Sequence, residues 1–184
     1  IVGSYSGHLM EWLRRGEMDL GLIYGPSSDL RLTVQSLGRD PIVAVGPRGS
    51  GLAQRKQVDI GWLLKQRLVL PSHSHGLRAL IEQAAAKKKL KLDVKLEADS
   101  FRVLTSLVEE GLGYSLLPPS SVRNEVADGR LEAAAIAKPA PMRELTLASP
   151  IDHPGSTAIT LVSELLRGEL VACREEGLWD IRLA

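Results

Sequence analysis

The sequence predicts an α/β protein, because two kinds of apolar pattern alternate along it. One is the spacing of an amphipathic helix, in which apolar residues return after three or four positions. It is clearest at Leu77, Leu80, Ile81, Ala84 and Ala85. The other is a short apolar run of strand length, such as residues 68–70. Strands that alternate with helices in this way indicate α/β units and a mostly parallel sheet.

Composition excludes several classes of protein. The 184-residue chain is 44% hydrophobic and 24% charged, which suits a soluble globular protein of one domain or two small lobes. Lys and Arg number 23 against 22 Asp and Glu, so no basic surplus suggests that this chain itself holds nucleic acid. The single cysteine, Cys173, rules out an internal disulfide framework and fits a reducing compartment. Without a membrane-length apolar run or a signal peptide, we expect a cytoplasmic protein with no membrane partner.

The amino-terminal segment is expected to form a helix followed by strands. The helix begins at Ser4 or Ser6 and ends at Gly16, where the apolar helical spacing stops. Strands are expected next at residues 19–24, 32–36 and 42–45. Glycine and proline punctuate residues 38–41, so a loop is expected between the second and third strands.

Later helices are expected to begin at polar or glycine residues that follow apolar runs. These starting points are Asp59, Gly76, Ser100, Ser120 or Ser121, and Ser156. The strands expected between them are residues 68–70, 94–96, 114–117, 131–136 and 144–148. The run Lys87-Lys88-Lys89 is interpreted as a solvated helix end rather than a phosphate-binding patch, because the chain as a whole is nearly neutral.

The stretch of residues 99–119 combines a helix, a tight turn and a strand. Ser100 is a typical helix-starting residue, because its short side-chain oxygen can accept a hydrogen bond from the first turn. Gly111 is expected to end the helix. Gly113 is expected to let the chain pass close to its neighbours, and a short buried strand then runs into two prolines.

This stretch resembles the signature of the effector-binding domain of LysR-type transcriptional regulators, which reads approximately V-x-x-G-x-G-[IV]-[AS]-[LI]-[LV]-P. Residues 108–118 match at nearly every position, and Tyr114 is the main departure. Five further motifs occur in the order of that family, and six together are far more specific than one. They are Gly3-Ser4-Tyr5-Ser6-Gly7, Gly16-Glu17-Met18-Asp19-Leu20-Gly21-Leu22, Val43-Ala44-Val45-Gly46-Pro47 with Gly51-Leu52-Ala53, Leu68-Val69-Leu70-Pro71 and Arg143-Glu144-Leu145-Thr146-Leu147.

The resemblance implies two Rossmann-like lobes, as in type 2 periplasmic solute-binding proteins. Lobe I is expected to hold residues 1–53 and 143–184, without its first strand and helix, and lobe II residues 54–142. The family's N-terminal helix-turn-helix DNA-binding domain is expected to be absent from this chain. The resemblance also implies a bacterial homodimer or homotetramer that contacts DNA only through that missing domain, and it leaves open a contact with RNA polymerase in the full protein.

Three strand-to-helix turns place hydroxyl groups at expected helix N-termini, where unpaired N–H groups and about half a positive charge favour anions. They are Gly3-Ser4-Tyr5-Ser6-Gly7, Pro71-Ser72-His73-Ser74 and Asp99-Ser100. A single serine of this kind is more often only a helix cap, but three together favour a carboxylate-binding cleft. The resemblance implies a small-molecule effector, bound between the lobes. The expected ligand-binding residues are Ser4, Ser6, Ser72, Ser74 and Ser100, with Tyr24, Gly25, His73 and Phe101 as weaker neighbours.

Enzymatic interpretations fail on context, so no catalytic residue, metal or cofactor is expected. The first turn resembles a nucleophile elbow, but its middle residue is Tyr5 instead of serine. His73 and His75 lack a second nearby cluster of metal ligands. The function implied is therefore ligand sensing, through which the full-length regulator would control DNA binding and transcription. A transport-linked solute-binding protein of the same fold is the alternative.

Overall fold

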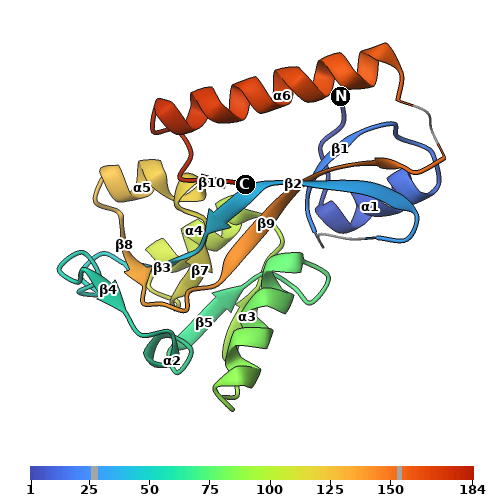
Figure 1. The fold of residues 1–184 in the computed structure, drawn as a ribbon. Helices are drawn as coiled ribbons and strands as arrows, with labels where there is room; N and C mark the ends of the chain where they lie inside the picture. The colour runs from blue at the N-terminus through green and yellow to red at the C-terminus, as the bar shows by residue number, and fades with distance from the viewer. Residues whose placement is uncertain (26–28, 153–154) are drawn as a thin grey trace. The chain divides into compact units, whose positions relative to one another are not determined.

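The computed structural model describes residues 1–25, 29–152 and 155–184. Contacts within the chain divide it into two compact units (Figure 1). Unit 1 comprises Ile1–Asp40 and Arg143–Ala184, and unit 2 comprises Pro41–Met142. Both units contain helices and strands, which confirms the predicted α/β class.

Unit 1 is built on a sheet whose strands come from both ends of the chain. The strands are β1 (Gly21–Tyr24), β2 (Leu32–Pro41), β9 (Met142–Pro150) and β10 (Arg182–Leu183), in the order β1-β9-β2-β10. Two helices accompany the sheet, α1 (Ser6–Arg14) and α6 (Thr157–Glu175). In Figure 1, α1 lies next to β1 and α6 extends along the sheet.

Strand β9 is buried on both faces over residues 145–148, because it separates two small cores. On one face, Ala148 packs with Leu9 and Leu13 of α1. On the other, Leu145 and Leu147 pack with Leu170 of α6. Burying a leucine of this size contributes roughly 1.5–3 kcal/mol, so these contacts hold both helices against the sheet.

Unit 2 contains two sheets. The four-stranded sheet has the order β4-β8-β3-β7 and comprises β3 (Val43–Pro47), β4 (Gln57–Val58), β7 (Ser115–Leu117) and β8 (Leu131–Ile136). The second sheet pairs β5 (Arg67–Leu70) in parallel with β6 (Asp93–Glu97). The helices are α2 (Ile60–Leu63), α3 (Gly76–Lys87), α4 (Phe101–Glu109) and α5 (Arg123–Ala127), the last preceded by a 3₁₀ turn at Pro119–Ser121. One continuous core lies between these elements.

The stretch of residues 99–119 folds as its sequence predicts. Helix α4 ends before Gly111, which has a φ of 73° that only glycine adopts without strain. A Cβ atom on Gly113 would lie 2.7 Å from the carbonyl oxygen of Arg67, so only glycine allows this approach to β5. The Tyr114 N–H donates to that oxygen at 2.8 Å, which links the turn to the second sheet.

Two expectations about strands are wrong for the described residues. The strand pairs are mainly antiparallel, since only β4 with β8 and β5 with β6 run parallel among the paired strands whose direction is described. Only one of these parallel pairs, β5 and β6, is joined by a single helix; the other pairings join segments that are distant in the chain. The expected loop at residues 38–41 is part of β2, because Gly38 and Arg39 pair with β10 at the carboxyl end of the chain.

The boundary of the first segment also differs from the expected one. Residues 41–53 were expected in lobe I, but they belong to unit 2. The physical reason is the pairing of β3, which forms antiparallel ladders with β7 and β8.

Candidate functional site

In unit 2 the two predicted serine turns lie side by side. The Ser72 N–H donates to Asp99 Oδ1 at 3.0 Å, and the rings of His75 and Phe101 have centroids 5.5 Å apart. Both turns follow the carboxyl ends of the parallel strands β5 and β6. Ligands of open α/β sheets bind at this edge, so the pair of turns is the candidate site of unit 2.

The N-terminus of α3 is closed by the chain itself. His75 is the N-cap residue, and its Nδ1 accepts a hydrogen bond from the Leu77 N–H at 3.1 Å. The His75 carbonyl oxygen accepts from the Arg78 N–H at 2.9 Å. His75 therefore serves as a helix cap.

The N-terminus of α4 is open. Ser100 is its N-cap residue, but the Ser100 side chain makes no capping hydrogen bond to the first turn. By contrast, Asp59 accepts from the Trp62 N–H at 3.0 Å in α2, and Ser156 accepts from the Ile159 N–H at 3.2 Å in α6. An α-helix leaves its first N–H groups without intrahelical partners, so α4 presents them together with an exposed hydroxyl.

The turn before α3 carries two neighbouring hydroxyl groups, and the carboxylate of Asp99, from the turn before α4, binds Ser72. The Oγ atoms of Ser72 and Ser74 lie 2.8 Å apart. Hydrogen bonds from the hydroxyl and the N–H of Ser72 hold the pKa of Asp99 below its ordinary value. Asp99 thus stays ionised and fixes the position of Ser72.

His73 is placed at this turn, but its ring nitrogens face α3. Its Nδ1 lies 3.0 Å from Glu82 Oε1, and its Nε2 lies 3.2 Å from Nη2 of Arg78. Both nitrogens are thus engaged within unit 2. Sequence analysis missed Arg78, whose side chain is buried, although a cation in the first turn of a helix was a signal that could have found it.

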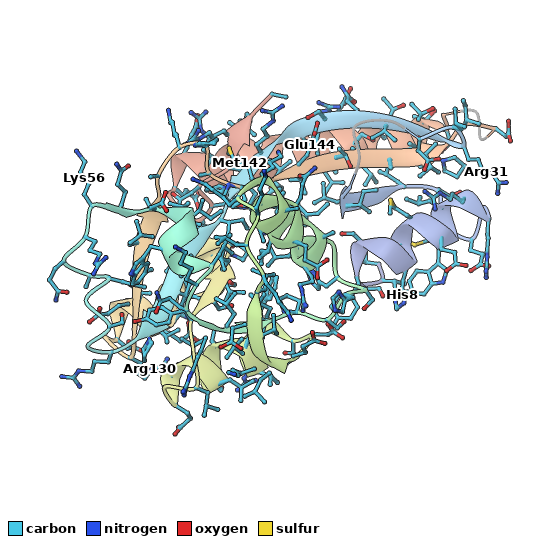
Figure 2. The ribbon with its side chains drawn as sticks, turned by 90° about the horizontal axis from the view of Figure 1, so that it is seen from below. His8, Arg31, Lys56, Arg130, Met142 and Glu144 are labelled. Atoms are coloured by element: carbon cyan, nitrogen blue, oxygen red, sulfur yellow. The ribbon has the colours of Figure 1, made fainter. Side chains whose placement is uncertain are left out.

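The predicted residues of unit 1 make hydrogen bonds within that unit. The Ser6 Oγ accepts a hydrogen bond from the Tyr24 N–H at 2.9 Å, and the Gly25 N–H donates to the Glu144 carbonyl oxygen at 3.3 Å. The Ser4 Oγ lies 3.3 Å from Nδ1 of His8, which is on α1 (Figure 2). Ser6 therefore has a structural partner inside unit 1.

The Tyr24 side chain points to a buried ionic cluster that sequence analysis did not predict. Its hydroxyl donates to Asp40 Oδ2 at 2.8 Å, and Trp179 Nε1 donates to Oδ1 of the same residue at 3.1 Å. Asp40 also forms an ion pair with Arg143, which lies over the Tyr24 ring. Burial raises the pKa of Tyr24 well above its ordinary value, so its hydroxyl remains a donor at neutral pH.

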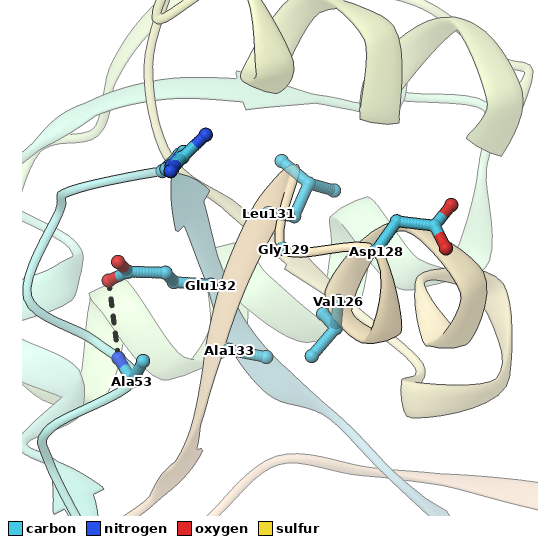
Figure 3. A pocket seen from close by; sticks show the side chains of 8 residues that line it. Ala53, Val126, Asp128, Gly129, Leu131, Glu132 and Ala133 are labelled. Carbon is cyan, nitrogen blue, oxygen red and sulfur yellow. Dashed lines mark hydrogen bonds between the residues drawn. The ribbon is translucent and has the colours of Figure 1, made fainter.

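A separate pocket of about 490 Å³ lies elsewhere in unit 2 (Figure 3). It is lined by Arg48, Ala53, Val126, Asp128, Gly129, Leu131, Glu132 and Ala133. Glu132 accepts hydrogen bonds from the N–H groups of Gly49 and Ala53, and the first of these is the main reason that its pKa lies below the ordinary value. The carboxylate thereby ties a loop to β8, and none of the predicted site residues lines this pocket.

Across residues 1–25, 29–152 and 155–184, no group of three or more His, Cys, Asp or Glu is placed to hold a metal ion. No helix in these ranges is long and apolar enough to span a membrane.

Each of the two α/β units carries serine-bearing turns at helix N-termini, an arrangement suited to a domain that binds a small ligand. The family model of the LysR substrate binding domain matches residues 2–171, so the chain belongs to this family. This confirms the resemblance found in its sequence. The transcriptional regulator BbuR of Bordetella bronchiseptica is 28% identical over 179 residues, which are 97% of this chain and 55% of that protein. The chain thus spans about half the length of such curated relatives.

Solved structures show the same fold. The effector binding domain of QuiR in complex with shikimate superposes with a TM-score of 0.77 and 19% identity, over 88% of this chain and 76% of that one. The regulatory domain of Synechocystis CcmR in complex with 2-PG superposes with a TM-score of 0.79 and 19% identity, over 90% of this chain and 79% of that one. The predicted fold class is thereby confirmed. BbuR is a transcriptional regulator by name, and the comparisons give no support to the transport alternative.

Proposed function

We propose that this chain senses a small carboxylate for a longer LysR-type transcriptional regulator, and that the carboxylate binds at the open N-terminus of α4. The observation that carries the proposal is the Ser100 hydroxyl, which occupies the N-cap position without capping the helix. The longer helices α3 and α6 are capped by side chains, whereas α4, like α1, has no side-chain cap, and only α4 of these two has a serine at the N-cap position.

The physical chemistry of this end favours an anion. Helix α4 has nine residues, and its N-terminal end carries the equivalent of about half a positive charge. Its first-turn N–H groups and the Ser100 hydroxyl can donate to one carboxylate, as helix ends do to phosphate. The neighbouring hydroxyls of Ser72 and Ser74 suit a hydroxylated ligand, because each can donate and accept. Shikimate, found with the structural neighbour QuiR, carries both kinds of group.

We also propose how the whole regulator is assembled and where it contacts DNA. DNA is contacted by a helix-turn-helix domain outside this chain, the protein is a cytoplasmic homodimer or homotetramer, and no reaction is catalysed. The near balance of 23 Lys and Arg against 22 Asp and Glu supports a sensing role for this chain. Its effector acts by the difference between its affinities for two conformations of the regulator.

Calorimetric titration with a panel of small carboxylates, shikimate included, tests the site. At least one member should bind, and Ser100→Ala should weaken that binding about tenfold or more, the cost of losing a hydrogen bond to a charged group. Ser100→Ala should hardly change stability, because no capping bond is lost. Ser156→Ala is the matched control: it should leave affinity unchanged and cost about 1 kcal/mol of stability. Unchanged affinity in Ser100→Ala would refute the site.

A further inference from the structure

Arg78 is a buried cation at an unfavourable place. It lies in the first turn of α3 with 4% of its surface exposed. The N-terminal end of a helix repels positive charge, and burial of a guanidinium is costly unless its donors are satisfied. Some compensating set of contacts must therefore hold it there.

Four acceptors surround the guanidinium. Nη1 donates to the Pro71 carbonyl oxygen at 2.9 Å and to Glu97 Oε1 at 2.7 Å. Nε donates to Glu82 Oε1 at 2.8 Å, and Nη2 lies 3.2 Å from Nε2 of His73. The guanidinium of Arg78 thus contacts the end of β5, the end of β6 and the body of α3.

The contact with His73 fixes the position of a proton. Arginine only donates hydrogen bonds, so Nε2 of His73 must accept from it. The ring proton then resides on Nδ1, which donates to Glu82 Oε1 at 3.0 Å. A His73 side chain that is 69% exposed is therefore held in one orientation and one tautomer.

The geometry points to Arg78 as a positioning residue for the turn that carries Ser72 and Ser74. It holds the Pro71 carbonyl on one side of Ser72 and the His73 ring on the other. With the Ser72 N–H on Asp99, these contacts orient both serine hydroxyls. This inference rests on the proposed function in one respect, namely that the effector contacts the turn of Ser72 and Ser74.

Nuclear magnetic resonance on the 184-residue chain tests the inference without a ligand. In the parent, the ¹⁵N resonances of His73 should report a proton on Nδ1. In Arg78→Met, His73 should lose this fixed tautomer. Hydrogen exchange of the Ser72 amide should accelerate about tenfold or more, as expected when a charge-assisted contact is lost. The Val69 amide, which bonds to Tyr114 in the core, should keep its parent rate.

The matched control is Arg130→Met. Arg130, at the periphery of unit 2 in Figure 2, pairs with Glu109, Glu125 and Asp128, none of which belongs to the turn. It should change neither the His73 tautomer nor the exchange of Ser72. If Arg78→Met does not fold, Arg78→Lys decides instead, because lysine keeps the positive charge but cannot reproduce all the contacts of the planar guanidinium.

Each result either supports or refutes a positioning role for Arg78. Selective acceleration at Ser72 with loss of the His73 tautomer supports positioning. Equal acceleration at Ser72 and Val69 assigns Arg78 to general stability, and no acceleration, or a parent His73 protonated on Nε2, overturns the inference. Failure of every carboxylate to bind the parent would refute the proposed function while leaving this result intact, so the two can be told apart.

Discussion

Removing Arg143 is expected to destabilise unit 1 strongly. Asp40 has no exposed surface, and its ion pair with Arg143 joins β2 to β9. The informative change is Arg143→Met, which keeps an apolar side chain of similar reach and removes the guanidinium. Asp40 then remains buried with two neutral donors, the Tyr24 hydroxyl and Trp179 Nε1.

The magnitude follows from these contacts. Breaking a buried ion pair by removing one partner costs about 3–5 kcal/mol, because the remaining charge stays desolvated. The guanidinium carbon of Arg143 also lies 3.7 Å from the centre of the Tyr24 ring, a contact of roughly 0.5–2 kcal/mol that methionine replaces in part. One feature offsets the loss: Nε of Arg143 has no hydrogen-bond partner among the described residues, so its burial already has a cost. We therefore expect about 3 kcal/mol, the lower part of the range.

Urea denaturation followed by tryptophan fluorescence measures the change. The control is Arg14→Met, which breaks an ion pair with Asp29 at a surface position where the Arg14 side chain is 38% exposed. Its expected cost is about 1 kcal/mol or less. The denaturant dependence of the unfolding free energy should be the same in both variants, because neither changes the surface exposed on unfolding. Equal losses in the two variants would refute the claim that the Asp40 pair is desolvated.

Two further predictions concern unit 2. Gly113→Ala places a Cβ about 2.7 Å from the Arg67 carbonyl oxygen and should cost roughly 1–3 kcal/mol in thermal unfolding, whereas Gly168→Ala, with open space around it, should be stabilising. The pKa of Glu132 is lowered in the folded chain by the Gly49 N–H, so its stabilisation is present above the ordinary pKa of 4.5 and is lost as pH falls through the folded value. Urea denaturation at a series of pH values below 4.5 should show that the unfolding free energy depends less on pH in Glu132→Gln than in the parent. The same pH dependence in both proteins would contradict this role of Glu132.

The parts of the fold that the sequence predicts are those with local causes. Helix α4, its end at Gly111 and the close approach at Gly113 depend on neighbouring residues, so their pattern is visible in the chain. The pairing of β10 with β2 is different. Residues 38–41 contain the glycine and proline of a loop, but Gly38 and Arg39 pair with a strand from the far end of the chain. Tertiary pairing here overrides a local turn signal.

In the candidate site, too, the features with local causes were predictable and those that depend on distant residues were not. Serines at three turns were predicted from helix-starting patterns, and the structure brings the two turns of unit 2 together. Which serine is a cap could not be predicted, because Ser100 and Ser156 look alike in sequence and differ only in a hydrogen bond. Tyr24 was expected near a ligand, but its hydroxyl binds Asp40, whose partner Arg143 is 103 positions away. No local pattern records such a pair.

Replacing both Asp40 and Arg143 tests whether their ion pair contributes net stability or is only costly to break. Asp40→Leu combined with Arg143→Met removes the unpaired charge that each single variant leaves, so the double variant should be more stable than either. Recovery should be incomplete, because the hydroxyl of Tyr24 and the N–H of Trp179 then lack their acceptor, and a buried donor without a partner costs about 1–3 kcal/mol. Adding Tyr24→Phe should therefore stabilise the double variant, although the same change in the parent removes a hydrogen bond. If the losses of the two single variants simply add in the double variant, Asp40 and Arg143 do not share one desolvated environment.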